Sequence, residues 1–201
     1  MEDCIMKWKA AVIPILVLAL ITTGCGDKKT DDPWTDPPGS SYDYTDPDAP
    51  KTIESKEITS FEYEFPTADL NEQKDRDIPY EICTFTLTRE ADHAICAGHS
   101  SGYADEVFDF EFFVPLSTLD DLQVIVGKHD LAQVNGIDKG IQGIPPFYAT
   151  HLSVKYASGE SIYASDNSAH VLTLDATAEL YDFFLVLAKA KDSSLMYSDK
   201  E

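Results

Sequence analysis

Alternating apolar and polar side chains predict a series of β-strands after residue 57. The alternation runs through residues 58–65, 80–88, 93–99, 108–112, 148–156 and 161–165. A period of two places every second side chain on the same face of a strand. Because the other face of each strand is polar, we expect an antiparallel sheet of about five to six strands with one face in water. Ser158 and Gly159 predict a tight turn between the last two strands.

Two segments carry apolar residues at helical spacing. Ser117 and Asp120 match the capping pattern of a helix start, and apolar residues then recur up to about residue 129. A second, more apolar stripe predicts a helix over residues 175–189. The order of strands and helices is typical of an α+β domain with two main helices packed on one face of the sheet.

Between these elements, two stretches are expected to be irregular. Residues 66–78 are polar, and residues 131–147 contain three glycines and two prolines. We therefore predict one α+β domain over residues 58–201, a length that can bury a core of its own.

The N-terminal residues have the pattern of a secretion signal. Lys7 and Lys9 precede an uncharged, mostly aliphatic run over residues 10–21. A membrane-spanning helix takes about 20 apolar residues, so this run is too short and favours a signal peptide. Glu2 and Asp3 do not suit the basic start of such a signal, so we expect Met6 to be the true first residue.

The sequence Ile-Thr-Thr-Gly-Cys over residues 21–25 resembles the bacterial lipoprotein signal. In that family a small residue precedes a Cys that is lipidated and becomes the first residue of the mature chain. Gly24 fits this pattern, whereas Thr22 stands where the family usually has Leu. The resemblance implies a lipoprotein signal peptide over residues 1–24 and acyl chains such as palmitate on Cys25. An ordinary cleaved signal, or a short uncleaved anchor, remains the alternative.

Residues 25–57 are rich in Asp, Pro, Ser and Thr and show no apolar period. Such a segment buries too little apolar surface to offset the entropy of ordering it. We therefore expect a disordered acidic tether between the anchor and the domain.

The charge of the chain restricts its partners. The formal net charge is -21 and the sequence pI is about 4.3. Residues 58–201 hold 25 acids and nine bases, so most of this charge belongs to the predicted domain. Binding to nucleic acid or to anionic lipid needs a basic surface, so neither is expected. We expect the lipid on Cys25 to attach the protein to the cell membrane, facing outside the cytoplasm.

Two further motifs resemble one protein family. Residues 135–139 read NGIDK, and residues 152–165 read LSVKYASGESIYAS. They are similar to a family of small uncharacterised lipoproteins from Gram-positive anaerobes, which share an NG-x-x-K turn followed by L-x-V-x-Y-x-(D/S)-G-x-x-I-x-A-S and a C-terminal amphipathic helix. The resemblance covers residues 58–190 and implies no activity and no site residues.

Cys83 and Cys96 lie on the two arms of one predicted hairpin. With a two-residue turn at Arg89 and Glu90 they would be directly opposite, and a disulfide would be allowed outside the cytoplasm. With a longer turn they would be staggered and would remain two buried thiols. The sequence leaves both alternatives open.

The sequence contains no signature of a catalytic, metal or cofactor site. The five histidines are not in a metal-binding spacing, and neither G-x-S-x-G nor a phosphate-binding glycine loop occurs. We therefore expect no cofactor. The long stretch after residue 134 is the candidate partner or ligand loop, bordered by the hairpin turn, and its residues are Asn135, Gly136, Lys139, Phe147, Ser158 and Gly159. We expect a binding or interaction module for a protein or small-molecule ligand; the alternative is a cell-wall or extracellular enzyme or an enzyme inhibitor.

Overall fold

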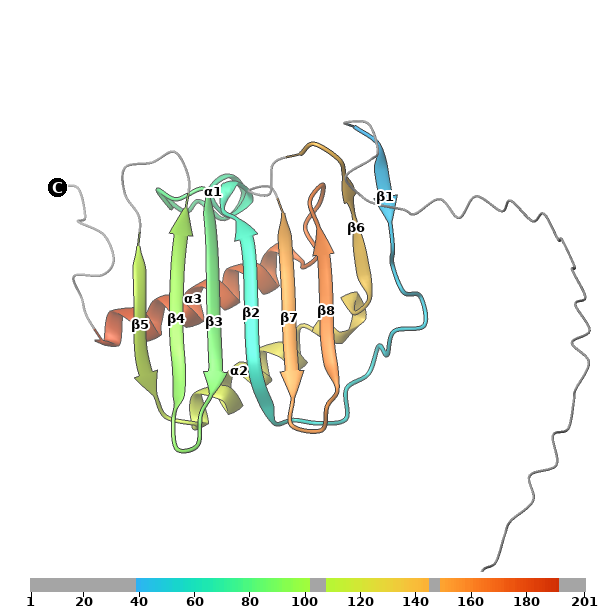
Figure 1. Ribbon diagram of the computed structural model, residues 1–201. Coiled ribbons are helices and arrows are strands. Elements are labelled where there is room, and N and C mark those ends of the chain that lie inside the picture. The colour runs from blue at the N-terminus through green and yellow to red at the C-terminus, as the bar shows by residue number, and fades with distance from the viewer. Residues whose placement is uncertain (1–38, 102–107, 145–148, 192–201) are drawn as a thin grey trace, which may run out of the picture. The chain divides into compact units, whose positions relative to one another are not determined.

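A mixed β-sheet with helices on one face forms the body of the protein. The computed structural model describes residues 39–101, 108–144 and 149–191, all of which belong to one compact unit. Figure 1 shows the elements in chain order. They are β1 (Ser41–Asp43), β2 (Ile58–Pro66), α1 (Ala68–Lys74), β3 (Ile82–Arg89), β4 (Ala94–Ser101), β5 (Asp109–Val114), α2 (Ser117–Lys128), a 3-10 turn (Leu131–Val134), β6 (Ile137–Ile141), β7 (Thr150–Tyr156), β8 (Ser161–Asp166) and α3 (Leu174–Lys191).

The strand order across the sheet is β1-β6-β8-β7-β2-β3-β4-β5. Neighbouring strands are antiparallel except β6 and β8, which are parallel. Strand β2 lies in the middle and pairs with both β3 and β7, so it connects the hairpin of β3 and β4 to the hairpin of β7 and β8. The predicted turn at Ser158 and Gly159 does join β7 to β8, and Gly159 has a φ of 88° that favours glycine there.

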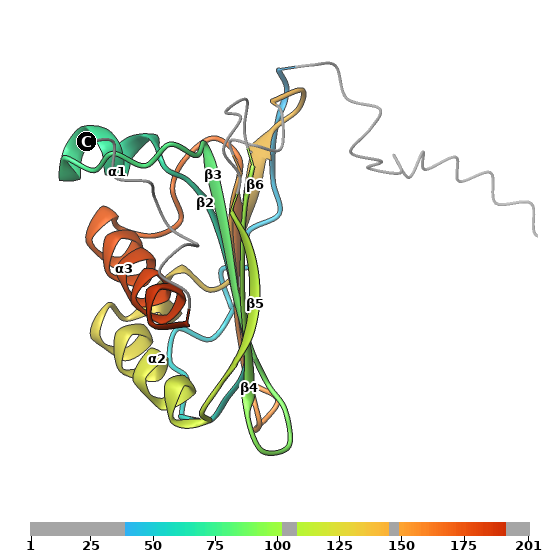
Figure 2. The ribbon, with the colours of Figure 1, turned by 90° about the vertical axis from the view of Figure 1, so that its left-hand side faces the viewer.

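The helices cover one face of the sheet (Figure 2). Alternation places the aromatic residues of β2 and β3, and Phe110 and Phe112 of β5, on that face, where they meet the apolar stripe of α3. Phe85 of β3 stacks on Phe184 of α3, with ring centroids 4.7 Å apart and planes 2° apart. Phe61 of β2 stacks on the same Phe184 ring at 5.8 Å. All three side chains are buried, so this aromatic layer is the centre of the core.

Polar contacts also join α3 to the other elements. The Tyr63 hydroxyl of β2 lies 2.8 Å from the Thr177 hydroxyl of α3, and burial raises the pKa of this tyrosine. Arg76 donates two hydrogen bonds of 2.6 and 2.7 Å to the two carboxylate oxygens of Asp182. Each contact forms only when α3 is rotated so that its side chain faces the partner. Together they therefore fix the orientation of the helix about its axis.

The α+β class is confirmed, but the sheet is larger than the sequence predicts. In the described part of the chain it has eight strands rather than five or six, it is mixed rather than antiparallel, and three helices accompany it. Strand β6 falls in the stretch predicted to be irregular. Glycine is required at position 140 of this strand, because a Cβ there would lie 2.4 Å from the Asn167 amide oxygen and 2.6 Å from the Tyr42 hydroxyl. Helix α1 was missed because it is seven residues long and buries only Leu70.

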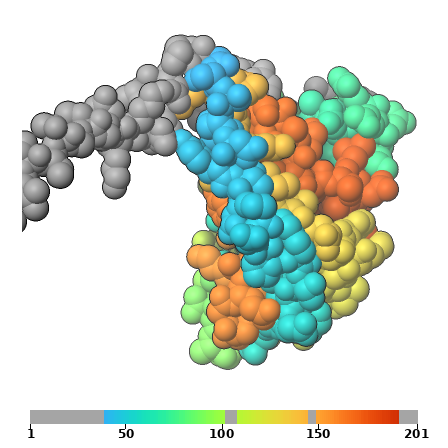
Figure 3. Space-filling view, turned by 90° about the vertical axis from the view of Figure 1, so that its right-hand side faces the viewer, coloured from blue at the N-terminus to red at the C-terminus, as the bar shows by residue number. Residues whose placement is uncertain are grey.

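The tether prediction is wrong for residues 39–57. This segment begins with β1, which pairs with β6, and it then follows the edge of the sheet to β2 (Figure 3). The backbone N–H groups of Glu54 and Ser55 donate to the two carboxylate oxygens of Glu160, at 2.9 and 3.0 Å. The segment is held by hydrogen bonds rather than by an apolar face. It therefore leaves no apolar period in the sequence from which it could be predicted. We call residues 44–57 the strap.

Residues 1–38 lie outside the described residues, and with them the predicted signal peptide and Cys25. In the three described stretches, no helix combines the length and the apolar character that crossing a membrane requires.

The aromatic layer gives a first prediction. Replacing Phe85→Ala removes the ring between the sheet and α3 and leaves a cavity, so the free energy of unfolding should fall by about 3–5 kcal/mol. Urea denaturation followed by circular dichroism measures this. Thr86→Ala, the next residue on the open face, is the control and should cost less than about 1 kcal/mol. Equal losses in the two variants would contradict the assignment of the core.

Candidate functional site

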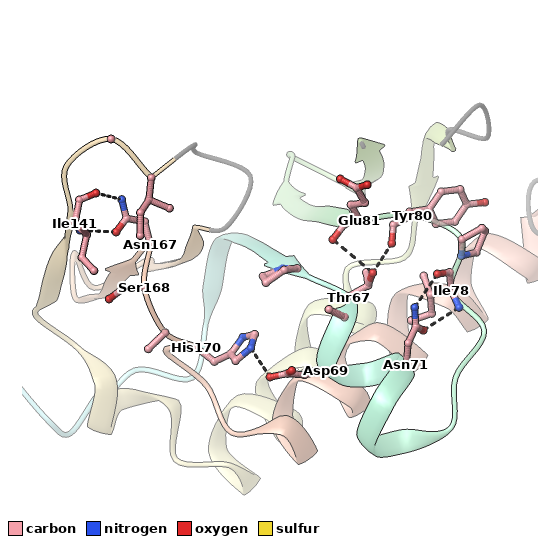
Figure 4. Close-up of a pocket in the computed structure, with 16 residues that line it drawn as sticks. Thr67, Asp69, Asn71, Ile78, Tyr80, Glu81, Ile141, Asn167, Ser168 and His170 are labelled. Atoms are coloured by element: carbon pink, nitrogen blue, oxygen red, sulfur yellow. Dashed lines mark hydrogen bonds and ion pairs between the residues drawn. The ribbon is translucent and has the colours of Figure 1, made fainter. Parts of the chain in front are cut away.

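A groove of about 1130 Å³ lies at the end of the sheet beside α1 (Figure 4). One wall comes from the end of β2, α1 and residues 78–81, and the other from residues 141–144 and 167–170. Pro66, Ala68, Ile78, Pro79, Ile141, Ile144 and Ala169 supply its apolar surface. The groove therefore combines apolar walls with a few polar groups, as ligand pockets usually do.

The wall beside α1 is fixed by hydrogen bonds to the backbone. The Thr67 hydroxyl donates to the Tyr80 carbonyl oxygen, and the Thr67 N–H donates to the Glu81 carbonyl oxygen at 2.9 Å. The Asn71 side chain both accepts from the Ile78 N–H and donates to the Ile78 carbonyl oxygen, each at 2.9 Å. This wall is therefore preformed, because its buried polar atoms are already paired.

Side-chain hydrogen bonds to the backbone fix the opposite wall as well. The Asn167 amide accepts from the Ile141 N–H at 2.7 Å and donates to the Ile141 carbonyl oxygen at 3.0 Å. Asp166 is 2 % exposed, and one carboxylate oxygen accepts from the Ser168 N–H, the Ser168 hydroxyl and the Ala169 N–H. These bonds shape residues 166–170 into a tight turn that faces α1.

A contact between a histidine and a carboxylate connects the two walls. The His170 Nε2 atom lies 2.6 Å from a carboxylate oxygen of Asp69, as the dashed line in Figure 4 shows. A His–carboxylate pair can act in catalysis when a nucleophile lies beside it. The nearby Ser168 hydroxyl donates instead to Asp166. Among the described residues the pair thus serves to hold the walls together.

A second hollow, of about 490 Å³, lies between the strap and the ends of β6 and β8. It brings together three of the residues predicted for the ligand loop, Asn135, Gly136 and Gly159. Tyr44, Asp138 and Tyr163 also line it, although no motif in the sequence selects them. Tyr44 lies in the segment predicted to be a tether, and Tyr163 lies in the predicted strand over residues 161–165.

Asn135 has a structural role in this hollow. Its side chain is paired with the free edge of β8, accepting from the Tyr163 N–H at 2.8 Å and donating to the Ser161 carbonyl oxygen at 3.2 Å. A further donated bond of 2.9 Å reaches the Pro50 carbonyl oxygen in the strap. The amide therefore covers the edge of β8 just before β6 begins.

Gly136 is required by the close approach of the strap. It has a φ of 85°, and a Cβ there would lie 2.5 Å from the Asp46 carbonyl oxygen and 2.5 Å from the Ala49 Cβ. The other predicted residues are less central. Lys139 Nζ lies 3.6 Å from Asp166, the Ser158 hydroxyl donates to Glu160 at 2.7 Å, and Phe147 lies outside the described residues.

The two cysteines are free and buried, so the disulfide alternative is wrong. Cys83 pairs with Ser100, and Cys96 pairs with Leu87. The turn is longer than the one a disulfide needs, because Arg89 pairs with Ala94. The four-residue offset separates the cysteines by about 13 Å along the strands, whereas bridged cysteines have Cα atoms less than about 7 Å apart.

No group of three His, Cys, Asp or Glu side chains suited to a metal ion is found among the residues the structure describes. His99 Nδ1 and a carboxylate oxygen of Asp109 are 3.9 Å apart on the open face of the sheet. That pair alone offers too few ligands for a specific site.

The cysteines give the prediction of this subsection. Burial raises the pKa of both thiols to about 12, so almost no thiolate forms at pH 8. In the folded protein, iodoacetamide should leave Cys83 and Cys96 unmodified at that pH, and in urea both should be alkylated. Peptide mass spectrometry reads each residue separately. Rapid labelling of either thiol before unfolding, or a tryptic peptide linking the two, would contradict the structure.

Comparison of the sequence with models of protein families and with curated proteins finds no match. The similarity to small lipoproteins of Gram-positive anaerobes therefore stays a prediction, and no site residue can be transferred from a relative.

Proposed function

We propose that the chain is a lipoprotein, held at the cell membrane by acyl chains on Cys25, whose domain faces outside the cytoplasm and binds a small amphipathic ligand. The observation that carries the binding function is the groove beside α1. Its volume of about 1130 Å³ is enough for a small molecule, since ligand pockets commonly measure about 300–1,000 Å³.

The chemistry of the groove supports this ligand class. Aliphatic and proline side chains favour the apolar part of a ligand. Polar atoms at the rim, such as the Glu81 carboxylate and the Ser168 hydroxyl, can meet a polar end. Because Asn71 and Asn167 already pair with the backbone, the groove needs little rearrangement to accept a ligand. The alternative of a wall or extracellular enzyme or inhibitor has less support, since the hydroxyl of Ser168 is directed to Asp166 rather than His170.

The anchor is tested by metabolic labelling. Cells expressing the full chain and fed an alkyne analogue of palmitate should incorporate label into the protein, and Cys25→Ala should abolish it. Cys4→Ala is the matched control, because Cys4 precedes the proposed cleavage point and its loss should leave labelling unchanged. Label retained in the Cys25→Ala variant would show that this residue is not the acylated one.

The groove is tested by photolabelling the full chain with 4-hydroxybenzophenone, a small amphipathic probe. We expect cross-links to concentrate on peptides containing residues 66–81 and 166–170. Ala169→Trp fills the groove and should weaken half-maximal labelling at least tenfold, equivalent to about 1.4 kcal/mol. Ala157→Trp, an exposed alanine in the β7–β8 turn, is the control and should change labelling less than twofold. Labelling spread evenly over the chain, or equal in both variants, would refute the site.

A further inference from the structure

The hollow between the strap and β8 exposes aromatic rings beside carboxylates. In the described part of the chain five large hydrophobic side chains are exposed, and two of them, Tyr44 at 50 % and Tyr163 at 42 %, line this hollow. Large rings left in water within a concave surface commonly mark a binding site. The hollow therefore differs from the rest of the open face, which is mainly hydroxyl and acidic.

Asp138 lies on β6, between the segment that carries Tyr44 and the strand that carries Tyr163. The Tyr44 N–H donates to the Asp138 carbonyl oxygen at 2.7 Å, so these two residues are neighbours across the β1–β6 ladder. Asp138 pairs with Ser165 on β8, and Tyr163 lies two residues before Ser165 on the same face. The three side chains thus come from adjacent positions on three adjoining segments.

The ring of Tyr42 lies beside the same group of residues. Tyr42 stacks on Tyr44, with ring centroids 5.5 Å apart. The pKa of Tyr42 is raised first by burial and then by the charges of Asp138 and Asp166, with Tyr163 and Tyr44 contributing less. Tyr42 therefore lies near the same carboxylate and the same two rings.

The charge in the hollow is unbalanced. Its lining includes the carboxylates of Asp46, Asp138 and Glu160, and no Lys or Arg is among the described lining residues. Glu160 is used by the strap, and one oxygen of Asp46 accepts from the Asp48 N–H at 2.9 Å. Lys51 is close by, but its Nζ donates to the Asn135 carbonyl oxygen. The Asp138 carboxylate forms no hydrogen bond or ion pair with the residues described here, and so is open to a ligand.

We infer that this hollow binds an alkylated ammonium group, with the cation against the faces of Tyr44 and Tyr163 and beside the carboxylate of Asp138. Aromatic rings attract such cations through their negative faces, and a nearby carboxylate adds a charge interaction. The strongly acidic domain also raises the local concentration of cations. This site is separate from the groove beside α1 and does not depend on what that groove binds.

The ammonium group has two sources, a quaternary headgroup or a lysine side chain, and two titrations distinguish them. Choline is compared with its neutral isostere 3,3-dimethyl-1-butanol, and Nα-acetyl-lysine amide with Nα-acetyl-norleucine amide. The full chain, with its tyrosine rings labelled with ¹³C, is titrated in a neutral detergent. We expect the ring signals of Tyr44 and Tyr163 to shift saturably at millimolar concentration with at least one cation, and to shift much less with its isostere. Absence of saturable shifts with both cations, or equal shifts with the isosteres, would overturn the inference.

Matched variants test the residues. Asp138→Asn should weaken cation binding at least fivefold, while Glu111→Gln, which removes the same charge from β5 on the same face, should change it less than twofold. Tyr163→Leu, followed through the Tyr44 signal, should also weaken binding, whereas Phe113→Leu removes an exposed ring at the other edge of the sheet and should not. Unchanged signals of the buried Tyr63 and Tyr181 verify the fold of each variant. Equal losses in Asp138→Asn and Glu111→Gln would show a general charge effect and refute the site.

Discussion

The stack of Phe85 on Phe184 is the contact on which the two layers of the protein depend. It joins the middle of the sheet to α3, and the alternation of β2 and β3 places the other aromatic side chains around it. Because the helices occupy only one face, every second residue of these strands faces water instead. The acidic charge of the domain can therefore collect on the open face without entering the core. The same division explains how a chain with a net charge of -21 keeps an aromatic interior.

A second constraint acts at the edge of the sheet, where exposed N–H and C=O groups invite other strands. Strand β6 covers only part of β8, since the register runs from Ile137 with Ala164 to Lys139 with Asp166. Beyond it the amide of Asn135 pairs with the β8 backbone, and the strap covers what remains. Asn135 and Gly136 both act at this edge. The Asn135 amide forms the hydrogen bonds to β8 that a neighbouring strand would otherwise form, and Gly136 leaves room for the strap. In the hollow these two residues hold the backbone in place, while Tyr44, Tyr163 and Asp138 provide the side chains that can contact a ligand.

Both candidate sites arise where the regular layers end. The groove forms because α1 and residues 167–170 rise beyond the sheet and are fixed by asparagine side chains. The hollow forms because the strap crosses the edge instead of extending into solvent. Apart from Pro66 at the end of β2, neither site uses the central strands β2 and β3, whose side chains pack in the core or lie on the flat open face. Two sites of different chemistry, one amphipathic and one acidic and aromatic, agree with the binding function proposed above.

Local side-chain order was enough to predict the strands from β2 to β5, the hairpin of β7 and β8, and the helices α2 and α3. These follow from periods of two and 3.6 residues, which local side-chain order displays. The sequence could not reveal β1, β6 or the strap, because those segments are held by hydrogen bonds to residues distant in the sequence, such as those between β1 and β6 and between Glu54 and Glu160, rather than by an apolar face of their own. The same holds for the cysteines, whose separation depends on a turn length that alternation does not fix. Only the tertiary structure brought Tyr44, Asp138 and Tyr163 together, since the pairing of distant edge strands decides which side chains become neighbours.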